Sequence, residues 1–178
     1  MLKSLFIAFF LSFPFFIKGE AQTTEQSKSS GLKKCTVFTA GDDNVNSYRI
    51  PSLLTAKDGT LLVFCEARRD SWRDKSRTDI VVKRSEDIGK TWSIMQDLTQ
   101  GTTGAYMDPT PVLDSITGRI FLFTTFWPAE DHSGAKNRAI LITSGDNGKT
   151  WSLPIDVTSA IIPAGYHIVG FGPGAGLQ

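Results

Sequence analysis

Cysteine, histidine and net charge are all scarce in this sequence of 178 residues. Its two cysteines are too few for a disulfide scaffold, and they leave two alternatives, a single Cys35–Cys65 bridge or a buried free thiol at Cys65 in the apolar run LLVFCEA. The net charge of +1 gives no electrostatic basis for binding nucleic acid. His132 and His167 lack the spacing of metal ligands. We therefore expect no metal, no cofactor and no nucleic-acid partner.

The sequence also lacks a long hydrophobic run. Its main apolar stretch, Leu5 to Ile17, is shorter than the roughly 20 residues that span a bilayer. A basic start precedes this stretch and small residues follow it, which is typical of a secretory signal peptide. We interpret residues 1–21 as that signal and the polar residues 22–34 as a flexible lead-in. The expected protein is secreted or periplasmic, with no stable membrane span.

Residues 35–178 contain an internal repeat. Two copies of a similar pattern follow each other, and each ends in a nearly identical octamer, SEDIGKTW from Ser85 and SGDNGKTW from Ser144. The apolar segments of each copy are rich in Val, Ile, Leu, Phe and Thr, and turns with Gly and Asp separate them, as in β-strands. No helical period is sustained. The pattern predicts an all-β fold of four-stranded antiparallel meanders, which are the blades of a β-propeller.

The octamers, residues 85–92 and 144–151, have a structural explanation. An aspartate side chain accepts hydrogen bonds from nearby backbone amides and closes a tight turn, and the glycine two residues later adopts angles that a side chain would disfavour. The tryptophan returns a large apolar ring to the core between blades. The residues to which we assign these roles are Asp87, Gly89, Trp92, Asp146, Gly148 and Trp151.

The order of strands predicts where functional residues meet. Each octamer joins the third strand of a blade to the fourth, whereas Arg49 and Asp108 enter the first strands of their blades. The charged stretch 66–79 joins strands two and three of the first blade. These three features therefore share the face opposite the octamers. The alternatives are a solvated loop for 66–79, a turn-forming role for Asp108, and a surface arginine in an extended corner, because Pro51 excludes helical geometry before it.

Two blades and the start of a third do not close a ring, and an open stack exposes strand edges. We therefore expect this sequence to be the N-terminal part of a longer protein. In this interpretation the glycine-rich end, GFGPGAGLQ, leads into the next strand.

Four motifs accompany the octamers: YRIP at 48–51, EARRDSWRD at 66–74, MDPTP at 107–111 and GPGAGLQ at 172–178. In combination they resemble the exo-α-sialidase (neuraminidase) family of the bacterial, animal and trypanosomal type, in which the octamers are called Asp-boxes or BNR repeats. The resemblance implies a six-bladed propeller, of which the first two blades and the start of the third are present here. It also implies hydrolysis of terminal α-linked sialic acids from glycoproteins, glycolipids or oligosaccharides, with retention of configuration.

The resemblance further implies roles for individual residues. Arg49 matches the first of three arginines that hold the sugar carboxylate. Asp74 matches the acid/base aspartate, with Asp70 as a local alternative. The other matches are Arg68 and, as a further candidate, Glu66 around the 4-hydroxyl, Asp108 near the N-acetyl group, and Trp127 as a pocket wall, for which a core position is the alternative.

The tyrosine nucleophile of the family, the glutamate that activates it and the remaining arginines lie beyond Gln178, so we expect this chain to be inactive by itself. The expected partners of the complete protein are sialylated glycoconjugates. Two alternatives stay open, a non-catalytic Asp-box propeller that binds glycans and a trans-sialidase. The sequence leaves the linkage preference and the oligomeric state undetermined.

Overall fold

The computed structural model describes residues 34–101 and 103–177. The signal peptide that we predict at 1–21, and the lead-in up to residue 33, lie outside the described residues. Within the described ranges, no helix has both the length and the apolar character needed to cross a membrane.

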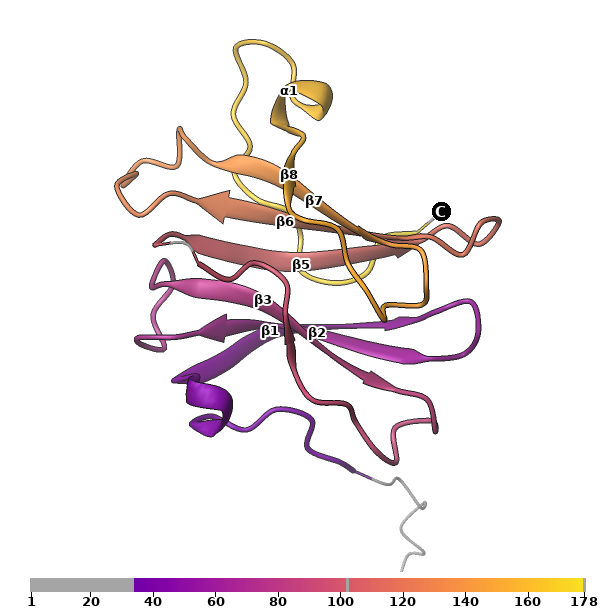
Figure 1. Ribbon diagram of the computed structural model, residues 1–178. Coiled ribbons are helices and arrows are strands. Elements are labelled where there is room, and N and C mark those ends of the chain that lie inside the picture. The colour runs from indigo at the N-terminus through magenta and orange to yellow at the C-terminus, as the bar shows by residue number, and fades with distance from the viewer. Residues whose placement is uncertain (1–33, 102, 178) are drawn as a thin grey trace, which may run out of the picture. The chain divides into compact units, whose positions relative to one another are not determined.

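The first repeat forms a four-stranded antiparallel meander (Figure 1). Its strands are β1 (Ser47–Thr55), β2 (Leu61–Arg68), β3 (Thr78–Ser85) and the short β4 (Gln96–Asp97). A single 3-10 turn, η1 (Asp42–Asn44), precedes them. The β-branched and aromatic residues that fill these segments suit a pleated, half-buried surface.

The second repeat forms the same meander, with β5 (Ala105–Leu113), β6 (Ile120–Trp127), β7 (Arg138–Ser144) and β8 (Ile155–Asp156). A four-residue helix, α1 (Thr158–Ile161), follows it. The two meanders join through one parallel bridge between Thr78 and Ala105. The predicted all-β fold of repeated four-stranded units is therefore confirmed.

The main core lies between the two meanders, which we now call blades. Alternate residues of the inner strands, Leu62 and Phe64 in β2 and Ile120 and Leu122 in β6, are completely buried there. Trp151, at the end of the second octamer, packs edge-on against Phe64 with ring centroids 5.6 Å apart. This octamer therefore contributes its tryptophan to the contact between blades. Trp92 of the first octamer is half-buried and lies outside this core.

Both octamers form the same hydrogen-bonded turn. In the first, Asp87 accepts bonds from the backbone of Lys90 and Thr91 and from the Thr91 hydroxyl. In the second, Asp146 accepts the corresponding bonds from the backbone and the hydroxyl of Thr150. Gly89 and Gly148 have φ values of +78° and +76°, which L-residues rarely adopt. The turns directly follow the last residues of β3 and β7. Each turn therefore lies at the end of its blade where the pairing of β2 with β3, or of β6 with β7, also ends.

A smaller core covers the other face of the first blade. It contains Val45, Cys65, Ala67 and Val81, and the partly buried side chains of Phe38, Tyr48 and Met95 pack against it. Cys65 is a buried free thiol and Cys35 is an exposed free thiol. Of the two alternatives for these cysteines, the structure has the free thiols.

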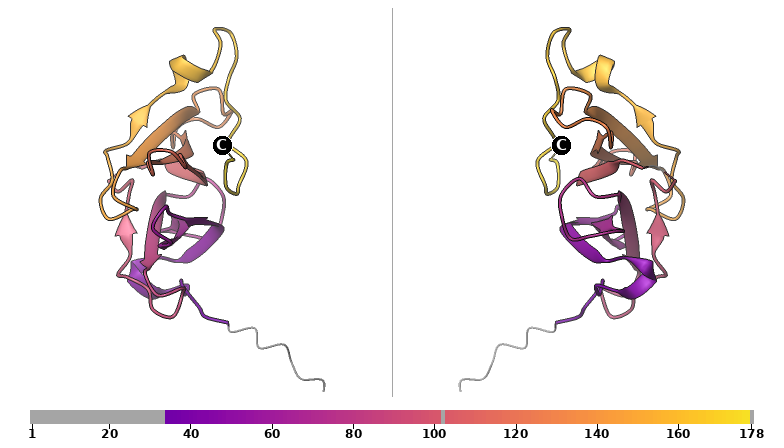
Figure 2. Two further views of the ribbon diagram at one scale, coloured as in Figure 1. Left: turned by 90° about the vertical axis from the view of Figure 1, so that its right-hand side faces the viewer. Right: turned by 90° about the vertical axis from the view of Figure 1, so that its left-hand side faces the viewer.

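The glycine-rich end, which we expect to lead into a next strand, has no regular secondary structure within the described residues. Among residues 162–177, which the structure describes, there is no strand. The segment instead passes along the side of β1 and β5, away from β4 and β8 (Figure 2). The carbonyls of Gly174 and Gly172 accept hydrogen bonds of 2.7 Å from the hydroxyls of Ser52 and Thr110, and the Gly176 amide donates to Pro111. The side-chain hydroxyls of the two blades thus hold this segment in place without a strand ladder.

Candidate active site

Two equivalent bulges shape the strands that carry the site. In the first blade, Arg49 pairs with Glu66 and Ser52 with Phe64, so that Ile50 and Pro51 together face a single residue of β2. The bulged residue Ile50 has a φ of +52°, which is unusual for a β-branched side chain. The corner is therefore left-handed, and the extended corner considered above is wrong. Such strain is found where structure serves a site.

The second blade repeats this corner. Asp108 and Pro109 interrupt the pairing of β5 with β6, and Asp108 has a φ of +57°. Asp108 therefore corresponds to Ile50, and Met107 corresponds to Arg49. Arg49 and Asp108, which the strand order predicts as equivalent entries to their strands, instead occupy successive positions of the same corner. Bulges redirect side chains in this way at the rims of sheets.

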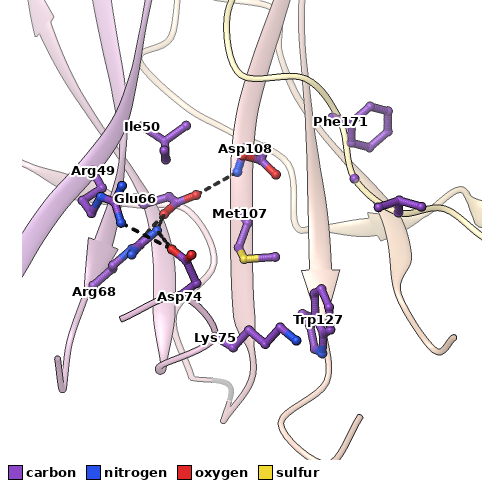
Figure 3. Close-up of a pocket in the computed structure, with 12 residues that line it drawn as sticks. Arg49, Ile50, Glu66, Arg68, Asp74, Lys75, Met107, Asp108, Trp127 and Phe171 are labelled. Atoms are coloured by element: carbon purple, nitrogen blue, oxygen red, sulfur yellow. Dashed lines mark hydrogen bonds and ion pairs between the residues drawn. The ribbon is translucent and has the colours of Figure 1, made fainter. Parts of the chain in front are cut away.

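A cleft of about 470 Å³ opens between these corners. The residues that line it come from both corners, the end of β2, the β2–β3 loop, the end of β6 and the C-terminal segment: Arg49, Ile50, Glu66, Arg68, Asp74, Lys75, Met107, Asp108, Trp127, Val169, Gly170 and Phe171. Figure 3 shows their side chains around the opening. All the candidate substrate-contacting residues from the sequence, Arg49, Glu66, Arg68, Asp74, Asp108 and Trp127, are brought together here.

Arg68 is the charged centre of the cleft floor. Its side chain is 3% exposed, and its Nε and Nη2 donate to Glu66 Oε2 at 3.0 and 2.7 Å. Its Nη2 also lies 2.7 Å from Asp74 Oδ1, and its Nη1 donates to the carbonyl of Trp72. One buried guanidinium therefore fixes the floor and the loop above it. Of the stretch 66–79, residues 66–68 and 78–79 belong to β2 and β3, where Glu66, Arg68 and Asp79 are buried, whereas the connecting residues 69–77 are exposed or half-buried.

Glu66 connects the two blades. Its Oε2 accepts from Arg68, and its Oε1 accepts the backbone amide of Asp108 at 3.0 Å. Burial raises the pKa of the Glu66 carboxyl above its usual range, against the opposing effects of the Asp108 amide and Arg68. With 1% of its side chain exposed, Glu66 acts on the cleft mainly through the groups it holds.

Asp74 and Asp70 differ clearly in their positions. Asp74 lies at the mouth of the cleft with 71% of its side chain exposed, and Arg49 Nη1 is 3.4 Å from its Oδ1. Asp70 lies outside the residues that line the cleft and forms an exposed ion pair with Arg77 at 3.0 Å. Of the two aspartates, Asp74 is the one with access to a molecule in the cleft.

Asp108 presents an unusual carboxyl group. Burial raises its pKa, and the neighbouring Asp74 carboxylate adds to this effect, while Arg68 opposes it. Within the described part of the chain, no hydrogen bond to this carboxyl is found, although the backbone of Asp108 is bonded to Glu66. It is therefore available to a polar group of a ligand.

Trp127 and Lys75 form the far wall. The Lys75 ammonium lies 3.6 Å from the centre of the Trp127 ring, and the Trp127 Nε1 donates to the carbonyl of Asp131. Trp127 is half-buried, so it is a cleft wall and not a fully buried core residue. Lys75, Met107 and Phe171 also line the cleft, although none of them is among the residues predicted from the sequence. Aligning the prolines of YRIP, MDPTP and GFGPG would have revealed the last two, because Arg49, Met107 and Phe171 precede their prolines by the same distance.

The cleft brings arginine side chains and the carboxyl groups of Asp74 and Asp108 together around one opening. Arginine has a planar fork of donors that suits a carboxylate. Exposed carboxyl groups that converge on such a fork can exchange protons with a bound molecule. Among residues 34–101 and 103–177, no three His, Cys, Asp or Glu side chains are placed to hold a metal ion.

Comparisons with known proteins agree on one family. Residues 50–178 match the family described as BNR repeat-like domain. A sialidase from Paraclostridium sordellii is 34% identical over 140 residues, which cover 71% of this chain and 34% of that protein. The chain belongs to the sialidase family. Sialidase-2 of Cricetulus griseus is 32% identical over 164 residues, which cover 83% of this chain and 42% of that protein.

Solved sialidase structures share the fold of the described residues. The Hadza microbial sialidase Hz136 superimposes with a TM-score of 0.71 and 30% sequence identity, over 78% of this chain and 31% of that one. The match identifies the two blades as part of a sialidase β-propeller. The chain spans about a third of the length of the bacterial sialidases it matches.

Proposed function

We propose that this chain forms one side of the active site of an exo-α-sialidase, which hydrolyses terminal α-linked sialic acids from glycoproteins, glycolipids or oligosaccharides. One observation carries the proposal: Arg49, Arg68, Asp74 and Asp108, from two repeats and one loop, converge on a single cleft. Membership of the sialidase family supports the same activity.

In this proposal Arg49 holds the carboxylate of the sugar. Its side chain is 45% exposed, and its ion pair with Asp74 at 3.4 Å is long, so its fork can receive a new anion. A bound carboxylate would compete with Asp74 for Arg49 and release Asp74 from one of its two arginines. Asp74 would keep its closer contact with the buried Arg68.

Asp74 then transfers protons. It protonates the leaving glycosidic oxygen in the first step and activates water in the second. Sialidases are an exception to the two-carboxylate scheme of most glycoside hydrolases and use a tyrosine nucleophile, because a second carboxylate would be repelled by the sugar's own carboxylate. In this mechanism that tyrosine lies outside this chain, and configuration is retained through two inversions.

The other residues shape the substrate site. Asp108 receives a polar group of the substrate, such as the N-acetyl N–H, and Trp127 forms the wall beside it. Arg68 lies below the 4-hydroxyl position. Because Glu66 is buried and bonded to both Arg68 and Asp108, we assign it the task of holding these two groups in place.

The direct test is release of a fluorogenic aryl group from an α-sialoside by the complete protein, with the 178-residue chain assayed in parallel. Activity in the complete protein alone would support the proposal. A folded complete protein that binds sialylated glycans without cleaving them would favour a non-catalytic propeller. Transfer to an added glycan acceptor in preference to water would indicate a trans-sialidase.

The role of Asp74 has its own test. In the complete protein, Asp74→Asn should reduce kcat for substrates with poor leaving groups by roughly a hundredfold or more, because their departure needs a proton. Aryl substrates with activated leaving groups should lose much less. Asp70→Asn is the matched control in the same loop and should change neither rate. Equal loss on both substrate types would contradict the assignment.

A further inference from the structure

The carbonyl group of Arg49 has an unusual hydrogen-bond partner. Cys65 is the single β2 residue that faces the two bulged residues Ile50 and Pro51. Its Sγ lies 2.9 Å from the Arg49 carbonyl oxygen, so the thiol donates to the backbone of the arginine that enters the cleft. The Cys65 residue is 3% exposed, which excludes water as a competing partner.

The second blade contains the same device. Thr124 is the single β6 residue that faces the bulged residues Asp108 and Pro109. Its hydroxyl donates to the carbonyl of Met107 at 2.6 Å, and Thr124 is completely buried. Two strands with different side chains thus place a short donor at the same point of the same corner. This repetition indicates that the donor belongs to the construction of the corner.

The side chain of Arg49 depends on this corner for its direction. Its guanidinium is half-exposed, and within the described ranges its one side-chain partner is Asp74, at 3.4 Å. Its backbone precedes a left-handed residue and a proline, which has no amide hydrogen to donate. A bond to the Arg49 carbonyl therefore acts directly on the residue whose side chain must be aimed.

We propose that Cys65 is a positioning residue, whose S–H···O=C bond to Arg49 holds the carboxylate-binding arginine in its productive direction. This inference rests on the proposed sialidase function. Cys65 has no contact with substrate in this scheme and acts only through Arg49.

The chemistry of the thiol fits this task. Burial raises the pKa of the Cys65 thiol to about 12, and the neighbouring Glu66 carboxylate adds to the shift. At neutral pH the thiol therefore keeps its proton, and with it its ability to donate. A protonated, buried thiol is also poorly reactive, which suits a structural donor.

The test uses the complete protein and two variants of equal shape. Cys65→Thr keeps a donor and copies the residue of the second blade, whereas Cys65→Val has the same shape without a donor. We expect Cys65→Val to weaken the binding of a carboxylate-bearing sialic acid analogue about fivefold, equivalent to roughly 1 kcal/mol for one hydrogen bond. The KM of the sialoside substrate should rise together with the dissociation constant of the analogue, whereas kcat should change less. Cys65→Thr, which keeps a donor, should leave both KM and analogue binding close to those of wild type.

A double-mutant cycle with Arg49→Ala separates positioning from a general loss of structure. If Cys65 acts through Arg49, Cys65→Val should have no further effect on analogue affinity in the Arg49→Ala background. A full fivefold effect in that background, or unchanged affinity in Cys65→Val alone, would overturn the proposal. If Cys65→Val does not fold, the smaller pair Cys65→Ser and Cys65→Ala makes the same comparison. A wild-type protein that neither binds nor cleaves sialosides would instead refute the sialidase function itself.

Discussion

Replacing Arg68 by methionine would remove the buried charge at the centre of the cleft floor. Arg68 and Glu66 have side chains that are 3% and 1% exposed, and they are joined by contacts of 2.7 and 3.0 Å. Methionine has a similar apolar length but no charge. In Arg68→Met the Glu66 carboxylate would therefore stay buried with only the amide of Asp108 as a partner among its present contacts.

The expected loss is large because a buried charge without its counter-ion is costly. Removing one member of a buried ion pair typically reduces the free energy of unfolding by about 3–5 kcal/mol. Adding Glu66→Gln should recover most of this loss, since a neutral amide still accepts from the Asp108 backbone. The exposed pair of Arg77 and Asp70, with side chains 50% and 59% exposed, lies in the same loop and provides the control. Arg77→Met should change stability little.

The loss should also depend on pH in a defined direction. Burial already raises the pKa of Glu66 above its ordinary value of 4.5, and Arg68 opposes that shift, so Arg68→Met should raise the pKa further. A raised pKa means that the folded state binds the proton more tightly. The stabilisation that a protonated Glu66 gives to the folded state is therefore fully present below its ordinary pKa of 4.5, and it is lost as the pH rises through the higher pKa of the folded state. The deficit of Arg68→Met relative to wild type should therefore be larger at about pH 8 than at about pH 5.

Urea denaturation of the four proteins at both pH values, followed by circular dichroism, measures these differences. The double variant should lie closer to wild type than Arg68→Met does. Equal, small losses for Arg68→Met and Arg77→Met would refute the reasoning, because they would mean that Arg68 is not a buried counter-ion. A deficit that is independent of pH would show that Glu66 does not titrate as its burial requires.

Two further predictions concern the octamer turns. Gly148→Ala and Gly89→Ala have the same backbone penalty, because both glycines have positive φ, but only at Gly148 would the new Cβ lie 2.6 Å from Leu62 Cδ2 in the core. Gly148→Ala should therefore lower the free energy of unfolding by about 1–3 kcal/mol more than Gly89→Ala, as measured by urea denaturation of this chain. Equal losses would contradict the contact between the blades. The Thr91 hydroxyl and amide lower the pKa of Asp87 to about 2, so its stabilisation is present above the ordinary value of 3.8 and is lost as the pH falls through about 2. Acid titration of Asp87→Asn should show a flatter loss of stability in that window than wild type, and identical curves would show that this turn does not contribute.

The repeat and its turns could be predicted from the sequence because they depend on local rules. Alternating apolar residues specify strands, and the octamer closes on its own aspartate, as Asp87 and Thr91 do. The face that carries the site followed from strand order alone, since successive connections of a meander alternate between its two ends. Arg49, Asp108 and the β2–β3 loop are indeed assembled at one cleft.

What the sequence did not indicate depends on contacts between distant segments. The Glu66 carboxylate that pairs with the buried Arg68 also accepts the Asp108 amide of the second blade, and a run of mixed charges gives no sign of this. The stacking of Lys75 on Trp127 joins a loop of one blade to a strand of the other. The path of the glycine-rich end is set by hydroxyls of Ser52 and Thr110, which lie far before it in the chain. Local patterns carry no information on such pairings.

The three proline corners explain how a repetitive fold produces a site without repetition. Arg49, Met107 and Phe171 each stand two residues before a proline, and all three line the cleft. The backbone bulge of the first two is the same, and each is fixed by a buried donor, Cys65 or Thr124. The constant part of the corner therefore sets direction, while the variable side chain sets chemistry: a cation, a thioether and an aromatic ring. Because the backbone of the corner is separate from the side chain that it directs, one corner can carry a cation while the next carries a thioether, and the blades can keep a common core.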